Sequence, residues 1–113
     1  VQGGTVAPHV QEFADEVCRQ LAACAISTYT GHQPSPDLAL DVLVSEGWGL
    51  YPADTTLGDA VASFAVNNSG AYGIDYVIWG NLIAGSWNGY QWVSYGGYGA
   101  TGGHYDHVHI GFY

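Results

Sequence analysis

The chain has 113 residues with 1 Lys or Arg, 10 Asp or Glu and 5 His, which gives a formal net charge of −9 at pH 7. This length suits one compact domain, and a hydrophobic content of 48% supplies a core, which excludes a disordered chain. Because Arg19 is the single Lys or Arg, the composition excludes a protein that tracks nucleic-acid phosphates or an anionic membrane surface. No apolar run reaches the ~18 to 20 residues that span a bilayer. The chain opens with Val1 and shows no signal peptide, as expected of a mature or excised piece.

The predicted secondary structure combines helices with short strands. Helical spacing of apolar residues after Pro8, which suits a first helical position, predicts the first helix. In chain order, the expected elements are a tail (1–7), a helix (8–22), strands (24–29 and 38–44), a second helix capped by Thr55 or Thr56 and ending near 70–73, a strand (76–79), Gly-rich loops or a hairpin (80–103) and a last strand (108–112). This order predicts an α+β fold with two main helices and a small, mostly antiparallel sheet, in a single domain over residues 8–113.

The two cysteines, Cys18 and Cys24, are six positions apart. On one continuous helix they would lie on different faces, so a disulfide requires the first helix to end between them. The alternative is a pair of buried free thiols. A disulfide would indicate an oxidising compartment, and the spacing does not fit a zinc knuckle.

Histidines gather near the C-terminus, where the sequence reads His104-Tyr105-Asp106-His107-Val108-His109. Side chains two apart in a strand share a face, so His107 and His109 are expected to project together while Val108 points to the core. Two imidazoles on one face suit a metal, or a metal with a catalytic base. The alternative is a surface strand rich in Tyr and His.

A second polar site is predicted around Asp41, which interrupts the apolar run over residues 38–44. A carboxylate at that place needs a cation, backbone donors or a metal as its partner. Since Arg19 is the only strong cation, a metal is favoured. His32 precedes the run on a loop stiffened by prolines, which can fold back over the strand.

Together, His32, Asp41 and His109 predict a site with three protein ligands and an open position, which is the arrangement of catalytic zinc. Such an ion makes hydroxide available near neutral pH and polarises a carbonyl. Either Asp106 or His107 is then expected to act as the base or to steady the tetrahedral intermediate.

The segments GHQPSPDLALDVLV, YGIDYVIWG and HYDHVHIGF resemble a secreted actinobacterial, fungal and phage domain family. That family is related to the zinc D-alanyl-D-alanine metallopeptidases, the murein endopeptidases and the hedgehog fold. The resemblance implies that fold and implies the roles of five residues: His32, Asp41 and His109 as zinc ligands, His107 as the non-ligand histidine beside the metal, and Asp106 as the acidic base.

The upstream motif departs from that of the peptidases. Their pattern places the His seven positions before the Asp, whereas His32 lies nine positions before Asp41. Pro34 stands at the position of the motif's His, and Asp37 at the position of its Gly. Asp37 is therefore the alternative to His32 as a ligand.

The resemblance implies a zinc-dependent hydrolase that cuts a peptide bond in the stem or cross-link of peptidoglycan. The expected location is outside the cell, in the cell wall or on a virion, and the expected state is a monomer. His104, Tyr105 and Trp92 are expected to contact the substrate, because aromatic rings on loops can stack on sugars or peptides. The alternative role for each ring is packing.

Two other functions compete with the peptidase. A metal-stabilised module that binds the cell wall without turnover would need His107 as a fourth ligand, since structural zinc takes four protein ligands. A glycosidase would need two carboxylates across a cleft, and the only pair on offer is Asp106 with Asp41 or Asp37.

Overall fold

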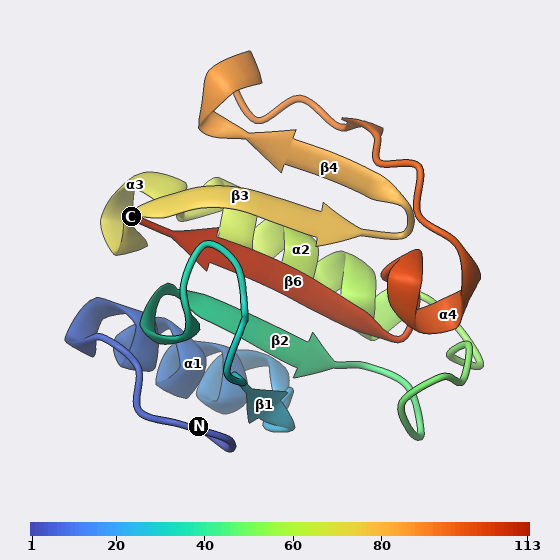
Figure 1. Ribbon diagram of the computed structural model, residues 1–113, viewed down its shortest axis with the longest axis horizontal. Coiled ribbons are helices and arrows are strands. Elements are labelled where there is room, and N and C mark those ends of the chain that lie inside the picture. Colours follow the sequence, from blue (N-terminus) through green and yellow to red (C-terminus); the bar gives the residue numbers. More distant parts are fainter.

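The computed structural model describes all residues from 1 to 113. Its α-helices, 3-10 helices (η) and strands are α1 (Pro8–Leu21), β1 (Ile26–Ser27), η1 (Pro36–Leu38), β2 (Ala39–Leu43), α2 (Thr56–Asn67), α3 (Ser69–Tyr72), β3 (Ile74–Trp79), β4 (Leu82–Gly85), η2 (Ser86–Asn88), β5 (Val93–Ser94), α4 (Gly99–Gly102) and β6 (His107–Phe112). The strands form one antiparallel sheet in the order β1-β2-β6-β3-β4-β5 (Figure 1). The predicted α+β class is confirmed.

One face of the sheet is covered by α1 and α2, which lie behind it in Figure 1. Alternate residues of the neighbouring strands β2 and β6, such as Leu40 and Val108, are fully buried on this face. They pack with Phe13 of α1 and Val61 of α2 in one hydrophobic core. Because side chains alternate along a strand, the residues between them point to the other face, which carries the polar site.

The first helix ends where the disulfide requires it to end. Ala22 follows Leu21 with a left-handed backbone (φ 56°), and the chain turns back. Cys18 and Cys24 then lie 4.4 Å apart at Cα and form a disulfide, as predicted. This bond is typical of proteins from oxidising compartments. None of the helices has both the length and the apolar character needed to cross a bilayer.

Several predicted boundaries are corrected. The strand expected over 24–29 pairs only at Ile26–Ser27, and the second helix stops at Asn67, where Asn68 hydrogen-bonds the Phe64 carbonyl at 2.8 Å, before the separate turn of α3. Thr55 is the N-cap residue of α2, as predicted, but its side chain makes no capping hydrogen bond; the Asp54 carboxylate accepts the Thr56 N–H at 2.9 Å instead.

The Gly-rich stretch and the N-terminal residues also hold regular structure. Residues 80–103 contain β4 and β5, which extend the sheet beyond β3, and the short helix α4. Gln2, in the predicted tail, forms an isolated parallel bridge with Ser27 of β1.

Candidate metal centre

The pairing of β2 with β6 brings the two predicted polar sites together. Asp41 lies directly opposite His109 in the register, and His107 lies opposite Leu43. Side chains directly opposite in an antiparallel pair are neighbours, so the carboxylate and both imidazoles meet on the face away from the helices. All three are buried, with exposed fractions of 5% for Asp41, 4% for His107 and 6% for His109.

His32 reaches the same point from the loop that follows β1 and crosses the front of the sheet in Figure 1. Its Nε2 lies 3.0 Å from Asp41 Oδ1 and 3.1 Å from His109 Nδ1. One ligand atom from each of these three residues falls within 4.8 Å of the others. Asp37 is exposed and hydrogen-bonded to Ser35, so the structure brings His32, and not the alternative Asp37, to the centre.

The outer hydrogen bonds fix which ring nitrogens carry protons. The Thr28 hydroxyl donates to the Pro36 carbonyl at 2.5 Å, so it can only accept from Nδ1–H of His32, at 3.0 Å. Nδ1–H of His107 donates to the carboxylate of Asp106 at 2.6 Å, because a carboxylate only accepts. The ring nitrogens of His32 and His107 that face the centre are bare when these two rings are neutral, and each can then bind a metal ion.

With these rings neutral, the centre holds more lone pairs than protons. Nε2 of His32 faces the Asp41 carboxylate at 3.0 Å, and Nε2 of His107 faces the same oxygen at 3.5 Å. His109 adds Nδ1 at 3.1 Å, and the Tyr76 hydroxyl can accept a hydrogen bond from its Nε2–H. Groups this close need a proton or a metal ion between them, and two imidazoles with a carboxylate form a donor set that suits zinc.

The charge state of Asp41 fits a ligand. Burial alone would raise the pKa of its carboxyl, but the contacts with His109 and His32 outweigh burial and hold that pKa well below its usual range. Asp41 is thus ionised at neutral pH and buried. Arg19 does not compensate it, because Arg19 pairs with Glu16 on α1, across the sheet.

Asp106 lies behind His107 and does not open onto the cleft. It is fully buried, and its carboxylate accepts hydrogen bonds from His107, from the Thr101 hydroxyl at 2.5 Å and from the Gly49 amide at 2.8 Å. Burial would raise the pKa of Asp106, but these hydrogen bonds lower it. The arrangement orients the His107 ring and does not suit Asp106 to take a proton from water itself.

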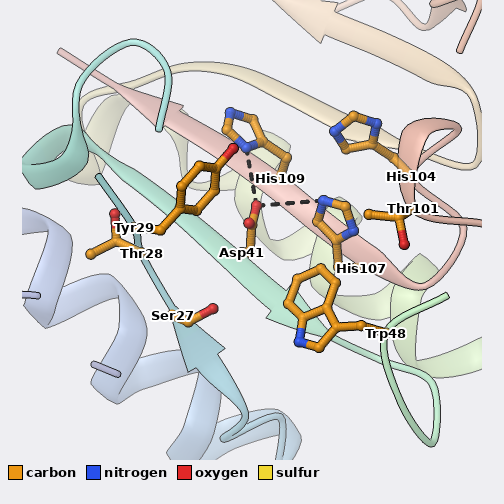
Figure 2. A pocket seen from close by; sticks show the side chains of 9 residues that line it. All are labelled: Ser27, Thr28, Tyr29, Asp41, Trp48, Thr101, His104, His107 and His109. Atoms are coloured by element: carbon orange, nitrogen blue, oxygen red, sulfur yellow. Dashed lines mark hydrogen bonds and ion pairs between the residues drawn. The ribbon is translucent and has the colours of Figure 1, made fainter. Parts of the chain in front are cut away.

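A cleft of about 470 Å³ opens over the centre (Figure 2), with Trp48 and Tyr29 on its walls. A second hollow of about 210 Å³ adjoins it and shares Tyr29, His104 and His109. Of the three side chains expected to contact substrate, only His104 lines the cleft. Tyr105 lines a hollow beside Tyr51 and Trp79, and Trp92 lines another against α2.

Comparison with known proteins identifies the family. The chain matches the model of the family described as VldE, C-terminal domain, over residues 2–108. The chain belongs to this family. No curated protein and no solved structure matches it. The family description names neither a metal nor a substrate, and nothing in these matches links this VldE C-terminal domain to the zinc peptidases or to the hedgehog fold.

The sequence did not single out three residues that organise the centre of this VldE C-terminal domain. Thr28 and Tyr76 hold the outer nitrogens of His32 and His109, and Thr101 holds Asp106. Period-two alternation along 74–79 could have placed Tyr76 on one face with Ile78. The sequence does not show that β3 is the strand next to β6, so the contact of Tyr76 with His109 could not be predicted.

In the metal-free domain, stability is expected to fall as the pH drops from 6.5 to about 4. Burial, helped by the neighbouring rings of His107 and His109, lowers the pKa of His104 from 6.5 to about 4, and burial also lowers the pKa of His109. In this window the unfolded chain binds protons that the folded chain does not, so the free energy of unfolding decreases as the pH falls.

The variant His104→Asn tests this dependence, because Asn tolerates the left-handed backbone (φ 58°) at position 104. Its melting temperature in chelator is expected to decline less steeply across the same window. Thermal melts at a series of pH values measure the slope, and a slope equal to that of the unmodified domain would contradict the assignment.

Proposed function

We propose that this VldE C-terminal domain is a zinc-dependent hydrolase that cleaves a peptide bond in the stem or cross-link of peptidoglycan. The observation that carries the proposal is the convergence of ring nitrogens of His32, His107 and His109 on the buried carboxylate of Asp41. The peptidoglycan substrate rests on the sequence resemblance to zinc peptidases of the cell wall. The disulfide fits a protein that meets this substrate outside the cell, in the cell wall or on a virion, and we propose that the protein acts as a monomer.

The residues would divide the chemistry between them. His32, Asp41 and His109 would hold the ion, which when bound polarises a carbonyl and lowers the pKa of water. His107 lines the cleft, and its Nε2, when unprotonated, can accept a proton from an attacking water and then return it to the leaving nitrogen. Asp106 would hold the His107 ring in the tautomer that this transfer needs.

The competing function is a cell-wall binding or structural module whose metal performs no chemistry. The observation that favours it is the position of His107, whose Nε2 faces the same Asp41 oxygen as the other two rings. A carboxylate behind a histidine is also the usual support of a metal ligand. With His107 as the fourth ligand, no position would remain for water or substrate.

Metal analysis and substrate digestion together test the proposal. Protein purified without chelator is expected to hold about one zinc per chain, and His109→Ala is expected to lose it. His9→Ala is the matched control, because His9 hydrogen-bonds the Tyr113 carbonyl away from the centre. Zinc-loaded protein incubated with purified sacculi should release peptide fragments detectable by mass spectrometry. Bound zinc without any released fragment would favour the structural module.

A further inference from the structure

The walls of the cleft carry hydroxyl groups and rings but no fixed cation. Its lining residues are Ser27, Thr28, Tyr29, Asp41, Trp48, Thr101, His104, His107 and His109. The chain's single Lys or Arg, Arg19, lies on α1 behind the sheet and is paired with Glu16.

The centre also lies beside two hollows that share lining residues. One hollow extends past Trp48 and Ser27, and the other extends past Gln33 and Tyr95. Both reach His109 and His104, which they share. A peptide whose scissile bond lay at the centre would have room for chain on both sides of that bond.

These two features select among substrates. A free carboxylate placed next to the scissile bond would lose its hydration in the cleft and meet no cationic side chain, which is costly. The net charge of −9 repels it further. A backbone amide at the same place can hydrogen-bond to the hydroxyls of Ser27 and Tyr29, which line the wall.

Building on the proposed function, we infer that the cleft cleaves bonds inside a peptide chain, flanked by amides, and discriminates against a bond beside a free C-terminal carboxylate. In peptidoglycan this selects the bridging bond of a cross-link, or a bond within the stem, over release of the terminal residue. The water adds to the scissile carbonyl carbon, the C–N bond breaks, and the leaving nitrogen takes the proton, so the products are one new carboxylate and one new amine.

The test uses zinc-loaded protein and purified muropeptides, analysed by mass spectrometry. Cross-linked dimers should be converted to monomers at least about tenfold faster than monomers lose their terminal residue, a factor that corresponds to about 1.4 kcal/mol. Ser27→Lys, which adds a cation to the cleft wall, should lower the ratio of the rate of dimer cleavage to the rate of terminal release. Ser63→Lys adds the same charge on the exposed face of α2 and should leave the ratio unchanged.

The outcomes separate this inference from the proposed function. If the terminal residue were released as fast as the bridge is cleaved, the inference would be wrong, but the proposed hydrolase activity would still stand. If neither product forms, the proposed hydrolase activity is wrong. The inference is then tested by calorimetry, which compares the binding of one muropeptide monomer as its free acid with the binding of the same monomer as its amide. Tighter binding of the amide by the zinc-loaded domain supports it, and equal binding, tighter binding of the acid or no binding overturns it.

Discussion

Replacing His107 by glutamine is expected to lower turnover of peptidoglycan by about 10²- to 10⁴-fold, the usual contribution of a positioned acid–base group. Glutamine keeps polarity at the site but cannot take up a proton as the bare Nε2 of His107 can. Zinc content should remain near one per chain, because His32, Asp41 and His109 are untouched. Turnover on muropeptides and metal analysis of the same preparation provide both numbers.

Asp106→Asn extends this test to the group behind the ring. The amide can still accept a hydrogen bond from Nδ1–H of His107, but it carries no charge, so a smaller loss of about 10- to 100-fold is expected. His9→Gln is the control histidine variant and should keep full turnover. Full turnover in His107→Gln would remove His107 from the mechanism, whereas loss of zinc in that variant would make it a ligand and favour the structural module.

The sequence predicted the parts of the fold that alternation and helix spacing control. The apolar positions of β2 and β6 alternate with Asp41 and His109, and the buried residues lie on the face the pattern assigned to them. Helix ends were harder, because Asn68 and Asp54 stop or cap α2 through particular hydrogen bonds that no periodic pattern encodes.

Around the centre, the sequence predicted the polar residues that would be costly to bury in a strand without a partner. Asp41 in an apolar run and the alternating His107 and His109 are such cases, and the structure gathers them at one point. Their supports could not be predicted, because Tyr76 reaches His109 only through the order of the strands. The placement of Tyr105 and Trp92 away from the cleft could not be predicted either, because the aromatic character of a residue does not reveal which hollow its ring faces.

Asp41→Asn is expected to cost more stability with zinc than with chelator. In the unmodified domain, zinc at about one hundred times its dissociation constant should raise the free energy of unfolding by about 2.7 kcal/mol. The variant should lose most of this gain, because the amide brings no charge to the ion. In chelator the variant should lose only the contacts of the ionised carboxylate with His32 and His109, which hold its pKa well below its usual range.

Thermal melts of both proteins, with added zinc and with chelator, measure the four stabilities. Asp59→Asn is the matched control, because the Asp59 carboxylate accepts hydrogen bonds from Trp79 and Thr55, away from the metal centre. Its effect should be the same under both conditions. If Asp41→Asn instead destabilised the domain equally with zinc and with chelator, Asp41 would be holding the fold through ordinary hydrogen bonds from protonated histidines, and the metal centre would be wrong. A larger loss with zinc than with chelator is the signature of a carboxylate whose partner is a cation that the protein does not itself supply.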